Sequence, residues 1–181
     1  MSNMEDDGMS ESVIEHRTQA LKALNLAVVT VSDTRTLETD TSGALIVALA
    51  EAAGHHVVER AIIPDEPTAM RPLFAGYANQ TNLHAVLVTG GTGISPRDQT
   101  FETVNALLTR PLPGYGELFR MLSYAEIGPA SMLSRAVGGL MGELVLLVMP
   151  GSRAAVQMAM EKLILPELPH LVREARKGGG S

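Results

Sequence analysis

The sequence predicts an α/β fold, a three-layer α/β/α sandwich with a mostly parallel central sheet and one antiparallel edge hairpin. Short apolar runs rich in Val, Leu and Ile alternate with helical segments almost throughout the chain, which is typical of a parallel sheet covered by helices on both faces. Glycine-rich or polar breaks follow several of these runs, as expected where strands end at loops. The length of 181 residues with 45% hydrophobic residues is sufficient for one domain with its own core.

Each apolar run is assigned to a strand, and the segments between them are assigned to helices. The expected strands are 26–32, 55–63, 85–89 and 143–149, with an edge strand and turn at 131–140. The expected helices are 43–53, 67–79, 101–108, 117–127 and 152–165, and Pro166–Pro169 restarts a last amphipathic turn or two. Thr41 or Ser42 is expected to cap the first helix. Residues 19–177 form one expected domain, between a polar, flexible N-terminal tail at 1–18 and a flexible Gly-rich end at 178–181.

The composition argues against several classes of partner. A formal net charge of -6 leaves no basic surface for DNA or RNA, and an aromatic content of 3% without Trp offers few bases a stacking platform. No apolar run is long enough to span a membrane. There is no cysteine, and the acidic start does not resemble a signal peptide. We therefore expect a cytoplasmic protein that binds neither nucleic acid nor membrane.

The stretch from Val86 to Thr100 is the strongest candidate for a functional site. An apolar strand ends in Gly90, Gly91, Thr92 and Gly93, a cluster that lets the backbone turn sharply and present free N–H groups to an anion. The pattern is not a phosphate-binding P-loop, because no Gly-Lys-Ser/Thr follows it. It is not a dinucleotide fingerprint either, because the loop after the first strand reaches only one glycine. We interpret it as a phosphate and magnesium site, with a tight turn that binds no ligand as the alternative.

Three loops are expected at the carboxyl edge of the sheet, at 32–41, 90–100 and 150–153. Asp40 and Asp98 lie in two of them, and two carboxylates with substrate phosphates suit Mg²⁺. Each of them could instead cap the helix that follows it.

Four further polar residues follow the strands. Asp33 could accept hydrogen bonds from a ligand or close an Asx turn, and Ser152 could donate to a ligand or cap the last helix. Arg97 and Arg153 could clamp an anion, although lone arginines are more often solvated.

These motifs together resemble the MoaB/MogA family of molybdenum cofactor biosynthesis proteins, and several segments are closer to the MoaB branch. The matching segments are Val29–Asp33, Asp40–Gly43, Ala53–Val57, Thr89–Gly93 followed by Arg97, Asp98 and Thr100, Pro113–Glu117, Ser134–Val137 and Met149–Ser152. They span residues 26–165 in the order in which the family has them.

The resemblance implies a molybdopterin-binding α/β domain that forms a homotrimer or homohexamer. It implies adenylation of molybdopterin with Mg²⁺ and ATP, with release of pyrophosphate, ahead of molybdate insertion. Asp40 and Asp98 would be the acidic pair at the metal and the substrate. The expected substrate-binding residues are Ser32, Asp33, Ser42, Thr89, Gly90, Gly91, Thr92, Gly93, Pro150, Gly151 and Ser152. The alternative is a non-catalytic molybdopterin-binding or scaffold oligomer in the same pathway.

Overall fold

A single six-stranded sheet forms the centre of the protein, which we describe for residues 23–177 of a computed structural model. The tail and the end expected at 1–18 and 178–181 lie outside these residues. The strands are β1 (Asn25–Val31), β2 (His56–Ile63), β3 (Ala85–Thr89), β4 (Arg110–Pro111), β5 (Val137–Met141) and β6 (Leu144–Met149). They lie in the order β2-β1-β3-β6-β5-β4. The first four of that order are parallel, and β5 is antiparallel to both of its neighbours.

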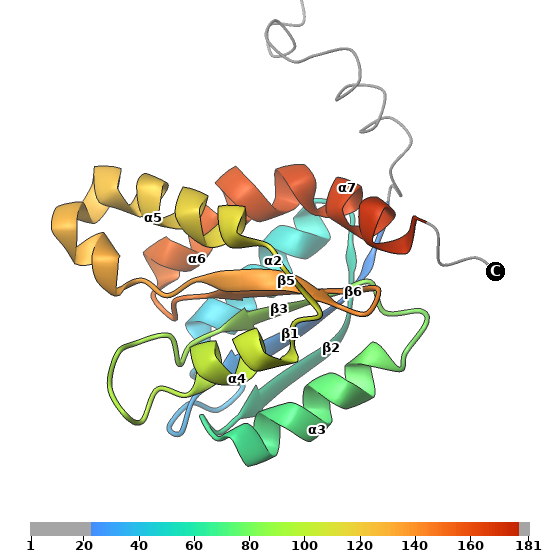
Figure 1. The fold of residues 1–181 in the computed structure, drawn as a ribbon, viewed down its shortest axis with the longest axis horizontal. Helices are drawn as coiled ribbons and strands as arrows, with labels where there is room; N and C mark the ends of the chain where they lie inside the picture. Colours follow the sequence, from blue (N-terminus) through green and yellow to red (C-terminus); the bar gives the residue numbers. More distant parts are fainter. Residues whose placement is uncertain (1–22, 178–181) are drawn as a thin grey trace, which may run out of the picture.

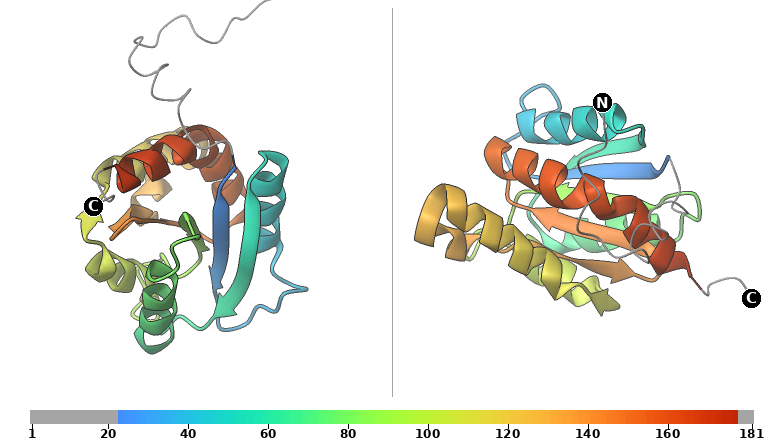
Figure 2. Two further views of the ribbon diagram at one scale, coloured as in Figure 1. Left: turned by 90° about the vertical axis from the view of Figure 1, so that its right-hand side faces the viewer. Right: turned by 90° about the horizontal axis from the view of Figure 1, so that it is seen from above.

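Helices cover both faces of the sheet, as Figures 1 and 2 show. One face carries α2 (Thr41–Ala52), α5 (Pro113–Ile127), α6 (Arg153–Ala159), the π-helical turn η2 (Met160–Ile164) and α7 (Leu165–Arg176). The other face carries α3 (Pro67–Ala78) and α4 (Thr100–Leu107). This arrangement confirms the predicted three-layer α/β/α fold. No helix between residues 23 and 177 combines the length with the apolar character that a membrane crossing would need.

The central strands are buried on both faces, so their side chains alternate between two separate cores. In β1, Leu26 and Val28 point into the core beneath α2 and α5–α7, whereas Ala27 and Val29 point into the core beneath α3 and α4. This explains why the strands are continuous apolar runs without polar alternation in the sequence.

The antiparallel part of the sheet differs in detail from the expectation. The strand expected at 131–140 begins only at Val137, because Gly128–Leu133 forms a 3-10 helix, η1, after α5. Gly142, with a φ of 65°, then turns the chain from β5 into β6, as a two-residue hairpin loop requires. The two-residue β4 pairs outside β5 and forms the edge of the sheet.

The C-terminal helix is longer than the turn or two that the prolines suggested. Pro166 lies near the start of α7, directly after the π-helical turn η2, and as a proline it donates no helical hydrogen bond. Pro169 lies further inside the helix, which follows the wider turn η2. Leu168 and Val172 are buried against the sheet, so tertiary packing maintains a helix that local sequence signals would have ended.

The order of the strands reverses between β1 and β3. From β1 the chain crosses to β2 on one side, and from β2 it crosses back to β3 on the other side. In open α/β sheets, ligands bind outside the carboxyl ends of the strands at such a reversal. Ser32 and Gly90, which directly follow β1 and β3, lie at this point.

Candidate functional site

Loops that follow four parallel strands meet at the carboxyl edge of the sheet. The Ser42 hydroxyl donates to the carbonyl of Gly151 (2.7 Å), and the Thr89 hydroxyl donates to that of Pro150 (3.2 Å). The amide of Ser32 donates to the carbonyl of Ile63 (2.8 Å). The structure therefore joins the three loops expected from the sequence and adds a fourth, which follows β2.

The glycine turn after β3 requires residues without side chains. Gly90 and Gly91 have φ angles of 101° and 63°, in a region that favours glycine. A Cβ atom at Gly90 would overlap the carbonyl of Val31, and one at Gly91 would overlap the Thr100 hydroxyl and the Asp65 carboxylate. These glycines are thus explained by close packing within the protein, independently of any ligand.

The same turn leaves backbone donors free. Within residues 23–177, the N–H groups of Gly91, Thr92, Gly93 and Ile94 donate to no acceptor. The carbonyls of Thr92 and Gly93, in contrast, both accept hydrogen bonds from the Arg135 guanidinium. Successive free amides in a turn are the chemistry of an anion-binding cradle.

A small pocket of about 140 Å³ lies between β1, β3 and the start of α2. Six of the predicted site residues line it: Ser32, Asp40, Ser42, Thr89, Gly90 and Gly151. The surrounding hydroxyl groups and backbone atoms suit a phosphate-sized polar group rather than an apolar one.

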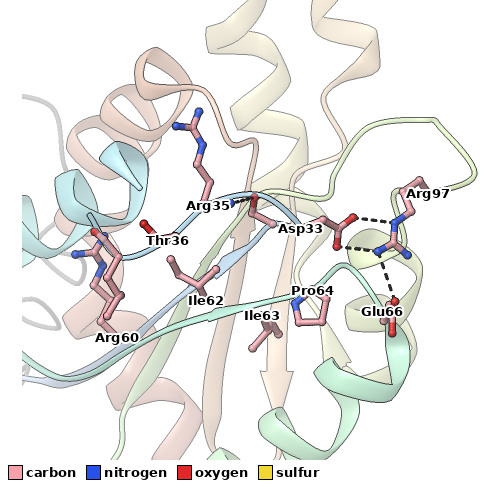
Figure 3. A pocket seen from close by; sticks show the side chains of 11 residues that line it. Asp33, Arg35, Thr36, Arg60, Ile62, Ile63, Pro64, Glu66 and Arg97 are labelled. Carbon is pink, nitrogen blue, oxygen red and sulfur yellow. Dashed lines mark hydrogen bonds and ion pairs between the residues drawn. The ribbon is translucent and has the colours of Figure 1, made fainter. Parts of the chain in front are cut away.

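A larger pocket of about 630 Å³ adjoins the small one and shares Ser32 and Arg35 with it. Figure 3 shows Ile62, Ile63 and Pro64 between Arg60 on one side and Arg97 with Glu66 on the other. An apolar surface with charged groups at its margin, at this volume, is typical of a site for a small organic molecule.

Asp40 is the buried N-cap of α2. Its side chain accepts from the amide of Gly43 (2.9 Å), the hydroxyl of Thr30 (2.7 Å) and Nη2 of Arg60 (3.0 Å), and the residue is 3% exposed. Burial alone would raise the pKa of this carboxyl, but the hydrogen bonds from Gly43, Thr30 and Arg60 outweigh it and hold the pKa below its ordinary value. The capping alternative for Asp40 is confirmed, and the expected cap by Thr41 or Ser42 is wrong. Both oxygens of Asp40 are engaged within the protein.

Asp98 closes a local turn and leaves one oxygen free. Its Oδ2 accepts from the amide of Ser95 (3.2 Å), whereas Oδ1 accepts no hydrogen bond from the described residues. A Cβ atom at Gly93 would lie 2.6 Å from Oδ2, so only glycine allows this carboxylate to approach the loop. Gln99 is the N-cap residue of α4, and its side chain makes no capping bond. The capping alternative for Asp98 is therefore wrong.

The structure does not bring Asp40 and Asp98 into a common pocket, since Asp98 lines neither of the two pockets described above. Among residues 23–177, no group of three His, Asp or Glu side chains could hold a metal ion. Mg²⁺ is commonly held by one or two carboxylates together with substrate phosphates and water, and the free oxygen of Asp98 fits that chemistry better than Asp40 does.

Asp65 is a functional candidate that the sequence interpretation missed. It is 5% exposed, and its Oδ1 accepts from the amide of Gln99 (3.1 Å) and the hydroxyl of Thr100 (3.0 Å). Burial raises the pKa of this carboxyl, and the nearby charges of Asp98 and Asp33 add to the effect. Its position just after β2 was a signal that could have identified it. It was missed because the loop after β2 was not counted among the loops at the carboxyl edge of the sheet.

Asp33 and Arg97 connect two of the loops by an ion pair. Nε and Nη2 of Arg97 donate to the two carboxylate oxygens of Asp33 (2.8 and 2.7 Å), and Glu66 lies 3.5 Å from Nη2 (Figure 3). The hydrogen bond from Arg97 lowers the pKa of Asp33. The Asx-turn alternative for Asp33 is wrong, since the amides of Thr34 and Arg35 donate to the Ser32 hydroxyl oxygen and not to the Asp33 carboxylate. The pair is exposed, so solvent and salt weaken it.

The remaining predicted residues have simpler roles. The Ser152 hydroxyl oxygen accepts from the amide of Ala155 (3.2 Å) and caps α6, which confirms that alternative. Arg153 is exposed and forms no ion pair with a described residue. Arg135, in contrast, contacts the glycine loop, although no role beyond its place in a motif was predicted for it.

Comparison with known proteins identifies this arrangement. Residues 27–170 match the family model described as "Probable molybdopterin binding domain". The chain belongs to this family. Its relatives include the molybdenum cofactor biosynthesis protein B of Bacillus subtilis (strain 168), which is 49% identical over 168 residues, covering 92% of this chain and 98% of the relative. The resemblance inferred from the motifs is thus confirmed, and the chain is a molybdenum cofactor biosynthesis protein.

Solved structures of the molybdopterin-binding family share the fold. A crystal structure of a molybdenum cofactor biosynthesis protein B superposes with a TM-score of 0.84 at 48% identity, covering 88% of this chain and 99% of that one. The tungsten cofactor synthesizing protein MoaB from Pyrococcus furiosus gives a TM-score of 0.75 at 36% identity, covering 87% of this chain and 99% of that one.

The packing of Gly91 can be tested by adding one methyl group. We expect Gly91→Ala to lower the free energy of unfolding by about 2–4 kcal/mol, from backbone strain and from overlap with Asp65 and Thr100. Gly54→Ala is the matched control, because Gly54 also has a positive φ (86°) but nothing lies within 4 Å of its Cβ position. Chemical unfolding should show a cost of about 1 kcal/mol for the control. Equal losses in the two variants would contradict the packing argument.

The lowered pKa of Asp40 predicts a specific dependence of stability on pH. Because the folded-state pKa lies below the ordinary value of 3.8, ionised Asp40 stabilises the folded protein above that pH, and this contribution is lost as the pH falls through the lowered value. Asp40→Asn should therefore cost about 1–3 kcal/mol near neutral pH and progressively less on acidification. Urea unfolding from about pH 7 to about pH 3 measures the difference. Glu143→Gln, at an exposed carboxylate, should show no such convergence with the wild type.

Proposed function

We propose that the chain is a molybdopterin adenylyltransferase that uses Mg²⁺ and ATP. The observation that carries this proposal is the row of free N–H groups from Gly91 to Ile94, which directly follows Gly90, a residue that lines the smaller of two adjoining pockets. Free amides in a turn favour phosphate oxygens, and both substrates of this reaction carry phosphate. Membership of the molybdopterin-binding family supports the choice of pterin substrate.

The reaction needs alignment and charge neutralisation rather than an activated side chain. An oxygen of the molybdopterin phosphate attacks the α-phosphorus of ATP, the bond from that phosphorus to the β-phosphate oxygen breaks, and pyrophosphate leaves with the bonding electrons. Holding the two phosphates in line supplies much of the rate enhancement, and fixed donors aimed at the developing charge supply more.

The two pockets suggest how the substrates are divided. The small pocket, with Arg35 and the Ser32 hydroxyl at its wall, would hold a phosphate group. The larger pocket, with Ile62, Ile63 and Pro64 under a charged margin, would hold a heterocycle. Ser32 and Arg35 line both pockets, so one molecule could occupy them together.

Asp98 is the proposed magnesium ligand, through Oδ1, which accepts no hydrogen bond from a described residue. Mg²⁺ held there would neutralise phosphate charge and orient the leaving pyrophosphate. Asp40 has a different proposed part: its engaged oxygens fix Arg60 and the start of α2, and so position Ser42 at the wall of the small pocket.

Self-association is also proposed, as a homotrimer or homohexamer. Six exposed apolar side chains, which we call the α5–η1 surface, come from one continuous segment of the chain: Leu118, Met121, Tyr124, Ile127, Met132 and Leu133. Apolar surfaces of this kind mark interaction sites more often than free surface.

The activity is tested by Mg²⁺-dependent release of pyrophosphate from ATP in the presence of purified molybdopterin. We expect turnover by the wild type and a loss of about 100-fold in kcat for Asp98→Asn. Glu51→Gln, at an exposed carboxylate on α2, should retain wild-type turnover. Binding of molybdopterin without any release of pyrophosphate would reject the enzyme and support the non-catalytic binding or scaffold protein.

The α5–η1 surface is tested by sedimentation velocity at micromolar concentration. Met121→Glu, at a side chain that is 60% exposed, should shift the protein from trimer or hexamer toward monomer, because a charge in an apolar interface must be desolvated. Val58→Glu places the same charge at a comparably exposed apolar residue on β2. A wild-type monomer, or equal dissociation of both variants, would contradict an interface at α5 and η1.

A further inference from the structure

We propose that Arg135 is a positioning residue, which orients the peptide groups of the glycine loop so that the amides of Gly93 and Ile94 face a bound phosphate. This inference deepens the proposed function and rests on the glycine loop being the phosphate site. Arg135 lies between η1 and β5, far from the loop in sequence, and its side chain is 21% exposed.

The guanidinium of Arg135 contacts consecutive carbonyl groups of the loop. Its Nε donates to the carbonyl of Thr92 (3.0 Å), and its Nη2 donates to the carbonyl of Gly93. Nη2 also lies 3.5 Å from the carbonyl oxygen of Asp98. One side chain therefore fixes several backbone acceptors, which the planar fork of arginine can do and a single ammonium group cannot.

These contacts determine where the neighbouring amides point. In a trans peptide group, the carbonyl of one residue and the N–H of the next lie in one plane and point in opposite directions. The carbonyls of Thr92 and Gly93 turn toward Arg135, so the N–H groups of Gly93 and Ile94 must turn away from it. Neither N–H has an acceptor among residues 23–177. The result is two free donors that point away from the arginine.

The guanidinium is itself held in place on two sides. Nη1 forms an ion pair with Glu102, and the guanidinium carbon lies 4.9 Å from the centroid of the Phe101 ring, a distance typical of a cation–π contact. Both partners belong to α4, the helix that directly follows the glycine loop. The permanent positive charge also offsets the negative ends of the carbonyl dipoles, so that an anion at the opposite amides meets a favourable field.

The test separates a role in anion binding from a purely structural one. The probe is inorganic pyrophosphate, titrated into the full-length ¹⁵N-labelled protein and followed by the amide resonances of Gly93 and Ile94. In the wild type both resonances should shift to saturation. In Arg135→Gln the dissociation constant should rise about tenfold, the loss expected for weakened charge-assisted hydrogen bonds, and the two shifts should shrink.

Two further variants define the control. Glu102→Gln removes the ion pair but keeps the carbonyl contacts of Arg135, so its affinity should stay within about twofold of the wild type. Arg135→Lys keeps the charge and one donor, so it should recover part of the lost affinity, and it takes over the test should the Gln variant fail to fold.

Several outcomes would overturn the inference. Pyrophosphate binding to Arg135→Gln with wild-type affinity and wild-type shifts would do so, and so would an equal loss in Glu102→Gln. Absence of any shift at Gly93 and Ile94 in the wild type would show that pyrophosphate does not bind at these amides. The adenylyl transfer assay is scored separately, so the proposed function can hold while the role of Arg135 fails.

Discussion

The chain must turn directly after β3 in contact with the end of β1, and the rest of the site depends on this close approach. Gly90 lies against the carbonyl of Val31, and Gly91 lies against Asp65 and Thr100, with no room for a Cβ atom at either position. A turn this tight brings the loop back over the sheet edge and leaves its next amides without partners. The arrangement of the pockets around the reversal of strand order follows from that path.

Two buried carboxylates stabilise the loops around this turn, and their environments differ. Asp40 is saturated by Gly43, Thr30 and Arg60, which together overcome the effect of burial on its pKa. Asp65 has fewer compensating donors and lies near other acidic groups, so its pKa is raised. Each binds the first turn of a helix, α2 or α4, where a negative charge is favourable. Asp40 and Asp65 thus organise the backbone at the start of two helices, whereas Asp98 closes a local turn through Oδ2.

The sequence predicted what short-range patterns determine. Continuous apolar runs identified the central strands, and the glycines after β3 identified the tight turn, because both signals lie within a few neighbouring residues. The partners of Asp40, Asp65 and Arg135 could not be found in this way. Arg60 lies 20 residues from Asp40, and Arg135 lies 43 residues from Thr92, and spacing alone cannot show which side chains the crossovers bring together. The same limit applies to α7, where burial of Leu168 and Val172 prevails over two prolines.

Arg60 also matters because it lies on β2, the strand at the edge of the sheet next to β1. The outer edge of such a strand offers free backbone N–H and C=O groups to which a strand of another chain could add, as in aggregation. Glu59 and Arg60 are consecutive on this strand, so their charged side chains point to opposite faces of the sheet. Arg60 is bound to Asp40, and the Glu59 carboxylate accepts from the Tyr77 hydroxyl (2.6 Å). Arg60, which orders the start of α2 through Asp40, therefore also places a charge on the outer strand that disfavours growth of the sheet by intermolecular strand addition.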